Sequence, residues 1–154
     1  MALSISVEAD PRVKRRLQEQ LTARLPEWFG LPASNLKYAA QAEILPGYIA
    51  RVDGEPRGLL LIKKHSDISF EIYWLGVDQN YHRSGIGRAL VEAGCTSAKA
   101  NNAKFMFVST LHPRVSHEPY ERTRLFYEAI GFRYVLEEQF PDKANPLALY
   151  MKCL

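Results

Sequence analysis

Hydrophobic residues recur with two different periods along this chain of 154 residues. Between residues 13 and 25 they return at every fourth position, directly after the helix-favouring pair Asp10-Pro11, so a helix with one buried face is expected there. Elsewhere, short apolar runs and strict alternation, as in residues 70–74, are typical of strands. The pattern predicts helices at 10–26, 34–43, 86–100 and 118–131, and strands at 48–52, 58–64, 68–77, 104–110, 132–139 and 146–152.

This order of elements predicts an α/β (α+β) fold, with a mixed, mostly antiparallel sheet that helices flank on both faces. Asp53-Gly54 is a typical hairpin turn between the first two strands, and a polar loop is expected to join the last two. Ser34 is expected to cap the second helix, whereas the basic residues within 12–16 should form a solvated face of the first. Phe126 and Ile130 are expected on the buried face of the last helix.

Length and composition limit the function classes. A chain of this length is expected to form one domain, residues 1–154. It contains neither a run of about 18 apolar residues nor a secretory signal, so we expect a cytoplasmic protein without a membrane partner. The net charge of +3 suits an anionic cofactor but does not favour nucleic acid. Cys95 and Cys153 match no disulfide framework or zinc site, so we expect packed, reduced thiols and no metal.

The most informative stretch is 75–91, where an apolar strand end passes through a polar turn into a helix that starts with Gly85-Ile86-Gly87-Arg88. The first N–H groups of a helix have no intrahelical acceptor, and the helix dipole adds partial positive charge at the same end. We call residues 78–88 the glycine turn. Such a helix start can bind phosphate, although most Gly-x-Gly pairs form ordinary turns. It differs from a P-loop because Arg88-Ala89 stands where Lys-Ser/Thr is required, and from a dinucleotide fingerprint because position 90 is leucine.

After Val77, the run His82-Arg83-Ser84-Gly85-Ile86-Gly87-Arg88 resembles the acetyl-coenzyme A signature of the GNAT superfamily of N-acetyltransferases, with histidine where glutamine or arginine is usual. A second block, residues 123–132, resembles the late Phe-Tyr-x-x-x-Gly-Phe helix of the same family. The resemblance covers roughly residues 45–154. It implies a GNAT-like fold, in which the sheet splays between the strands 68–77 and 104–110 and the cofactor enters the gap.

The resemblance also implies an N-acetyltransferase that uses acetyl-coenzyme A as cosubstrate. Acetyl transfer needs a well-placed thioester, a neutral amine, a donor for the developing oxyanion and a proton for the leaving thiolate. Backbone donors near Gly76 and Val77 would serve the oxyanion, and Tyr127 stands where the family often has its thiolate acid. The cofactor-binding residues implied are Leu75, Gly76, Val77, His82, Arg83, Ser84, Gly85, Ile86, Gly87, Arg88 and Tyr127.

Glu71 is the candidate general base and also a candidate acceptor-binding residue. It precedes Gly85 by 14 residues, the spacing at which the histone-acetylating branch of the family has a glutamate base. Other members use different residues or only water, so Glu71 could equally bind a cationic acceptor or form a plain cross-strand charge.

Trp28, Phe29 and His112 are the remaining candidates for the acceptor site, because the resemblance places the first helices and the loop before the last helix beside it. Trp28 and Phe29 could instead form a hydrophobic staple between helices. His112, like the nearby His117 and Glu118, could be a loop polar group or a helix cap.

We expect direct attack of a small-molecule primary amine, because neither cysteine lies in a motif for a covalent intermediate and no added recognition domain is evident. A protein lysine or N-terminus is the alternative acceptor. A non-catalytic module that binds acyl-coenzyme A would leave Tyr127 dispensable, and a nucleotide-binding domain is a third alternative. Many relatives pair as dimers, so the resemblance also implies a homodimer as one assembly.

Overall fold

The computed structural model describes residues 1–139 and 145–154. Its strands form one mixed seven-stranded sheet within these ranges, in the order β1-β2-β3-β4-β5-β7-β6. The chain divides into two compact units, residues 1–63 with 72–97 and residues 64–71 with 98–154. None of the helices in the described residues has the length and apolar character needed to cross a bilayer.

The first unit contains an antiparallel β-meander, two helices from the N-terminal part of the chain and the helix that follows the glycine turn. β1 pairs with β2, and β2 pairs with β3, both antiparallel. Asp53 and Gly54 have φ of 51° and 86°, which confirms the predicted hairpin turn. The elements are β1 (Leu3–Glu8), α1 (Pro11–Arg24), α2 (Pro32–Ile44), β2 (Gly47–Val52), β3 (Glu55–Lys64), β4 (Ser69–Val77), the short 3-10 helix η1 (Gln79–Tyr81) and α3 (Ile86–Ala100).

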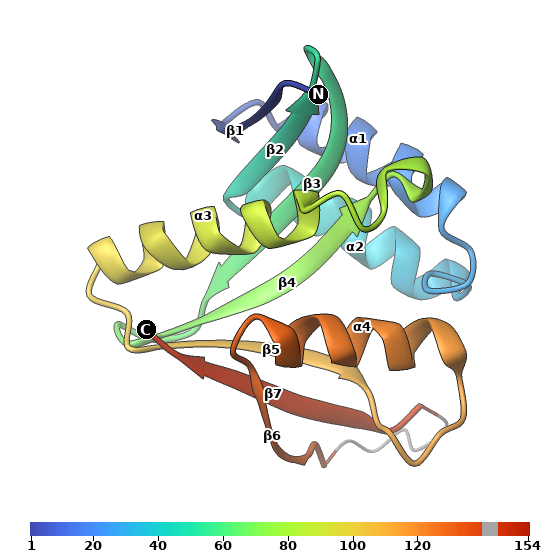
Figure 1. The fold of residues 1–154 in the computed structure, drawn as a ribbon, viewed down its shortest axis with the longest axis vertical. Helices are drawn as coiled ribbons and strands as arrows, with labels where there is room; N and C mark the ends of the chain where they lie inside the picture. The colour runs from blue at the N-terminus through green and yellow to red at the C-terminus, as the bar shows by residue number, and fades with distance from the viewer. Residues whose placement is uncertain (140–144) are drawn as a thin grey trace. The chain divides into compact units, whose positions relative to one another are not determined.

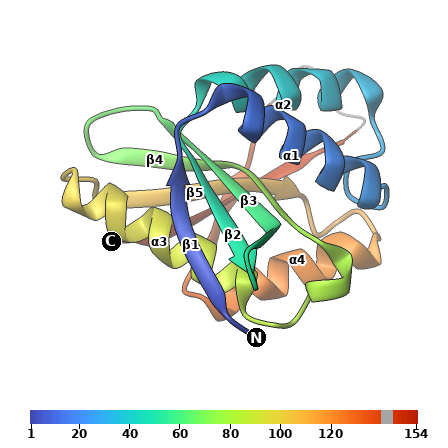
Figure 2. The ribbon, with the colours of Figure 1, turned by 90° about the horizontal axis from the view of Figure 1, so that it is seen from above.

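Helices cover both faces of β3. Residues 58–62 of this strand are all buried. Leu59 and Leu61 belong to a core cluster that also contains Leu17 and Leu21 of α1. Figure 2 shows α1 and α2 on one side of β1–β3 and α3 on the other. A continuous apolar run, rather than alternation, is therefore the sequence pattern that this strand requires.

Glycine allows α3 to approach the sheet closely. A Cβ atom at Gly58 would lie 3.0 Å from Leu90 Cδ1, and one at Gly94 would lie 2.8 Å from Leu60 Cδ2. The contact at Gly94 would be shorter than real Cβ contacts, and the one at Gly58 would be tighter than most. Glycine at these two positions therefore favours the close approach of the α3 backbone to β3.

Two expectations for the N-terminal region were wrong, and one strand was not predicted. The strand β1 was missed, because its apolar residues are not all buried and Val7 is 69% exposed. Lys14 is not solvated: it is 4% exposed, and its Nζ donates to the Leu45 carbonyl at 2.6 Å. Ser34 does not cap α2, which begins at Pro32 after Leu31.

The second unit contains the first residues of β4, with β5 (Phe105–Leu111), α4 (Glu118–Ala129), β6 (Arg133–Glu137) and β7 (Leu147–Cys153). β4 pairs with β5 in parallel from Ser69–Phe105 to Glu71–Phe107, whereas β7 pairs antiparallel with both β5 and β6. Figure 1 shows α4 alongside β5 and β7.

The last helix buries a different face from the one predicted. Arg124 and Tyr127 are its buried residues, whereas Phe126 and Ile130 are only half-buried. Arg124 can be buried because its Nη1 donates to the Leu111 carbonyl at 2.8 Å. The polar loop predicted between the last two strands includes residues 140–144, which lie outside the described residues.

The cysteines also differ from the expectation. Cys95 is a buried residue of α3, but Cys153 is exposed at the end of β7, so only the first is a packed thiol.

Replacing Gly94 with valine is expected to lower the free energy of unfolding by about 1–3 kcal/mol, because the added atoms overpack the contact with Leu60. Urea unfolding measures the change. Glu92→Val is the matched control on the same helix, since the Glu92 side chain is 65% exposed. The control should change stability by no more than about 0.5 kcal/mol, and equal losses in the two variants would contradict the proposed packing.

Candidate active site

The glycine turn changes the direction of the chain between β4 and α3. Asp78 begins it: its Oδ1 accepts from Asn80 N at 3.0 Å, and its carbonyl accepts from Tyr81 N at 2.8 Å. Arg83 and Gly85 then adopt φ of 62° and 84°. Two residues in the left-handed region turn the backbone sharply into the helix, and the glycine does so without steric cost.

The start of α3 presents unpaired donors. The first intrahelical bond runs from Ala89 N to the Gly85 carbonyl at 3.0 Å. The N–H groups of Ile86, Gly87 and Arg88 come before this donor, so they have no acceptor within the helix. No atom lies within 4 Å of the place where a Gly85 Cβ would stand. The turn is thus open to an incoming group, and its donors and helix dipole favour an anion.

Arginine side chains add positive charge at this turn. Arg83 is exposed. Arg88 is 61% exposed, and its Nε lies 3.6 Å from Glu92 Oε1, a surface pair of low energy that a stronger anion could replace.

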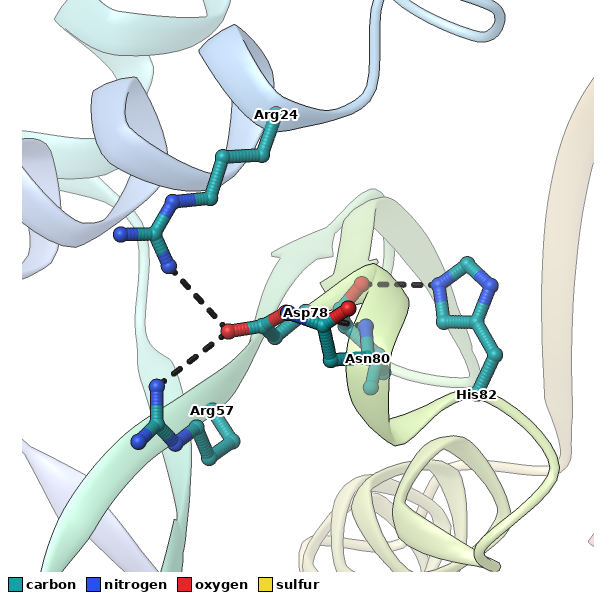
Figure 3. A network of polar contacts seen from close by, with 6 residues as sticks. Arg24, Arg57, Asp78, Asn80 and His82 are labelled. Carbon is teal, nitrogen blue, oxygen red and sulfur yellow. Dashed lines mark hydrogen bonds and ion pairs between the residues drawn. The ribbon is translucent and has the colours of Figure 1, made fainter.

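A buried carboxylate with two arginine partners lies at the start of the turn. The Asp78 side chain is 4% exposed, and its Oδ2 lies 3.2 Å from Arg24 Nη1 and 3.3 Å from Arg57 Nη1 (Figure 3). The Arg57 guanidinium lies 4.9 Å from the centre of the Tyr81 ring. This network could not be predicted from the sequence, because its arginines are 54 and 21 positions away from Asp78 and neither belongs to a motif.

His82 stabilises the backbone of the turn through its side chain. Its Nε2 lies 2.8 Å from the Val77 carbonyl oxygen. The dashed line at His82 in Figure 3 marks this contact. The ring of Trp28 meets the His82 ring edge-on, with centroids 5.7 Å apart. Trp28, a predicted acceptor residue, therefore contacts the glycine turn directly.

Phe29 and Gly76 both lie beside Trp74. Phe29 stacks on the Trp74 ring with centroids 5.1 Å apart, and it also meets the Tyr38 ring at 6.3 Å. A Cβ atom at Gly76 would lie 2.3 Å from Trp74 Cη2, so only glycine fits between Leu75 and Val77. Phe29 is half-buried and packs against the core cluster that contains Trp74. If Phe29 contacts the acceptor, it does so as part of this aromatic cluster.

Glu71, in the second unit, has a histidine partner. Its Oε1 lies 2.7 Å from His65 Nε2, and its side chain is 17% exposed. The His65 ring in turn lies 5.0 Å from the ring of Phe107. The carboxylate is therefore held by a group that can itself carry a proton, which is a property of acid–base sites. His65 lies in a turn without a motif, so its contact with Glu71 could not be predicted from the sequence.

Tyr127 is buried among aromatic rings. It is 4% exposed, and its ring centroid lies 5.1 Å from Phe126 and 5.4 Å from Phe132. Burial raises the pKa of the Tyr127 hydroxyl above its ordinary value, and the charge of Tyr120 raises this pKa further. The hydroxyl therefore stays protonated at neutral pH, as a proton donor must.

The histidines before α4 have local structural contacts. His117 caps this helix, since its Nδ1 accepts from Tyr120 N at 3.4 Å. His112 Nε2 lies 3.2 Å from the Tyr134 hydroxyl, and its Nδ1 accepts from Arg114 N at 3.1 Å. Within residues 1–139 and 145–154, no group of three or more His, Cys, Asp or Glu could hold a metal.

A cavity of about 400 Å³ adjoins these histidines in the second unit. Its lining residues include Glu121, Arg124, Glu128 and Tyr150. His112 immediately precedes the first lining residue, Pro113. Glu121 and Glu128 are its exposed acidic residues, whereas Arg124 and Tyr150 are buried.

Comparisons with known proteins identify relatives of this chain. A family model described as "Acetyltransferase (GNAT) domain" matches residues 45–134, more than half of the chain. A mycothiol acetyltransferase from Propionibacterium freudenreichii subsp. shermanii is 31% identical over 126 residues. The match covers 78% of this chain but only 34% of that relative, so the chain spans about a third of its length.

Solved structures share the fold along nearly the whole chain. A GNAT-family protein from Desulfovibrio desulfuricans superposes with a TM-score of 0.82 at 18% identity, over 97% of this chain and 98% of that one. A GNAT family acetyltransferase from Elizabethkingia anophelis with acetyl-CoA bound superposes with a TM-score of 0.71 at 15% identity, over 99% and 98%. At these identities the likeness shows the fold alone, and it confirms the predicted fold class.

Tyr127→Phe is expected to change how stability depends on alkaline pH. Burial raises the pKa of Tyr127 in the folded state, so the unfolded chain loses this proton at lower pH than the folded chain does. The contribution of the hydroxyl to the free energy of unfolding should therefore decline above pH 10.0, its ordinary pKa. The difference in unfolding free energy between wild type and variant should therefore fall, by at most about 1.4 kcal/mol per pH unit. Urea unfolding from pH 8 to pH 11 measures it, and parallel curves would show that the hydroxyl ionises as easily in the folded state.

Proposed function

This chain belongs to the GNAT family of acetyltransferases, and on that premise we propose that it is an acetyl-coenzyme A-dependent N-acetyltransferase. In this proposal the acceptor is the primary amine of a small molecule, which attacks the thioester directly. The observation that carries the proposal is the geometry of the glycine turn.

The glycine turn suits the pyrophosphate of coenzyme A. The N–H groups of residues 86–88 lack intrahelical acceptors, and Gly85 leaves the approach open. Arg83 and Arg88 are exposed at the same turn and could add charge-assisted hydrogen bonds. His82 would act through the backbone that it holds at Val77.

Tyr127 is the residue that we assign as the proton donor to the leaving thiolate. Its raised pKa keeps the proton on the hydroxyl at neutral pH, so the hydroxyl can donate a hydrogen bond to the thiolate as it forms. Packing between Phe126 and Phe132 holds the ring in place, so little reorganisation is needed when the thiolate leaves.

Glu71 is the proposed base that removes a proton from the acceptor, directly or through water. Amines reach an enzyme mainly as ammonium ions, because their pKa resembles that of lysine, and only the neutral amine is a nucleophile. The hydrogen bond to His65 fixes the carboxylate and supplies a second group to pass the proton on.

The cavity in the second unit supports a small-molecule acceptor. Its volume of about 400 Å³ falls within the range of ligand pockets. The carboxylates of Glu121 and Glu128 would attract an ammonium group, whereas Arg124 donates to the Leu111 carbonyl. Trp28 and Phe29 remain proposed contacts for the acceptor.

Acetyl-coenzyme A and coenzyme A should each raise the melting temperature, whereas ATP and NAD at the same concentration should not. A hundredfold excess over the dissociation constant corresponds to about 2.7 kcal/mol of added stability. Differential scanning fluorimetry measures the four shifts in parallel. An equal shift with ATP would instead support a nucleotide-binding domain.

Tyr127→Phe should lower kcat by about a hundredfold, because the thiolate would lose its proton donor. Thiol release with a panel of small amines, lysine peptides and peptide N-termini measures turnover and also identifies the acceptor class. Tyr48→Phe in β2 is the matched control and should keep wild-type turnover. Undiminished turnover in Tyr127→Phe would contradict the assigned role, and coenzyme A binding without turnover of any acceptor would support a non-catalytic module.

A further inference from the structure

We propose that Asp78 is a positioning residue for the cofactor: its buried carboxylate, clamped by Arg24 and Arg57, holds the glycine turn in the shape that binds pyrophosphate. This inference rests on the proposed binding of coenzyme A. It assigns Asp78 no direct contact with the cofactor.

Every polar group of Asp78 is engaged. Oδ2 faces the two guanidinium groups at 3.2 and 3.3 Å, while Oδ1 accepts from Asn80 N at 3.0 Å. The backbone N–H donates to the Arg57 carbonyl at 2.7 Å, and the Asp78 carbonyl accepts from Tyr81 N. A carboxylate that is 4% exposed is tolerated only with such partners, so its position is tightly specified.

These contacts join segments that are distant in the sequence. Arg24 is the last residue of α1, and Arg57 lies in β3. Figure 3 shows both side chains pointing toward Asp78 from their separate elements. The contacts with α1 and β3 therefore hold the turn in place, in addition to its covalent connection to β4.

The constraint continues from Asp78 along the turn. The Arg57 guanidinium lies over the Tyr81 ring at 4.9 Å, and Ser84 Oγ donates to the Tyr81 carbonyl. Next come Arg83 and Gly85, with their positive φ, and then the first turn of α3. Fixing these groups before the ligand arrives lowers the ordering cost of binding.

The negative charge is as important as the hydrogen bonds. In an Asp78→Asn variant, the amide oxygen could still accept from the Asn80 N–H, but the neutral side chain could not balance the charge of two arginines. Arg57, which is 28% exposed, would then be free to leave Tyr81 for solvent. Asp78→Asn therefore removes the clamp while it preserves the shape of the side chain and the cap of η1.

The test compares Asp78→Asn with wild type by calorimetric titration with coenzyme A and by hydrogen exchange of the free proteins. We expect the dissociation constant to rise about tenfold, since the unliganded turn is no longer preorganised. The hydrogen-bonded turn amides of Asn80, Tyr81 and His82 should exchange faster, while those of β2 and β3 keep their protection. A purely global loss of stability would raise exchange in all three segments together.

Asp53→Asn is the matched control, because Asp53 is also a turn aspartate that accepts a backbone N–H, from Ala2 at 3.0 Å. It should leave the dissociation constant unchanged. If Asp78→Asn does not fold, Arg24→Met and Arg57→Met carry the test, and each should weaken coenzyme A binding.

The possible failures are distinguishable. Wild-type affinity in Asp78→Asn, or in both arginine variants, would overturn the positioning role and leave the proposed function intact. Absence of coenzyme A binding by the wild-type protein would overturn the proposed function itself, and this inference with it.

Discussion

The close packing of α3 on β3 is the constraint on which the candidate cofactor site depends. Gly58 and Gly94 allow the helix backbone to approach a strand that is buried on both faces, and Leu60 and Leu90 fill the contact. The direction of α3 is thereby set by the core rather than by the turn that precedes it. A helix whose axis is fixed in this way also has a fixed N-terminus, where its unpaired donors and partial positive charge are located.

The glycine turn connects the end of β4 to this fixed helix. It does so through unusual backbone conformations. Positive φ at Arg83 and Gly85 changes the chain direction within a few residues. For the arginine this conformation is unfavourable, so the surrounding contacts have to impose it. The clamp at Asp78 and the bond from His82 to the Val77 carbonyl are contacts of that kind. Core packing and local electrostatics thus act together on the same few residues.

Elements with a strong local signal could be predicted from the sequence, whereas buried charges could not. The helix at 86–100 was placed correctly, because its glycine start and the left-handed Asn102 after it are local features. β1 was missed because backbone pairing with β2, which holds an edge strand, leaves little trace in the side-chain pattern. The burial of Lys14 depends on the Leu45 carbonyl and that of Asp78 on two arginines, all remote in sequence, so periodicity assigns both charges to the surface. The backbone cradle of the site could therefore be predicted, but the charges that support it could not.

The distribution of these charges connects the structure with the proposed chemistry. The formal net charge is +3, but positive and negative groups gather at different places in the chain. In the first unit, the helix N-terminus and the exposed Arg83 and Arg88 favour an anion such as a pyrophosphate. In the second unit, Glu71, Glu121 and Glu128 provide carboxylates that favour a cation such as an ammonium group. An N-acetyltransferase must bind one partner of each sign, so the local charges carry information that the net charge does not.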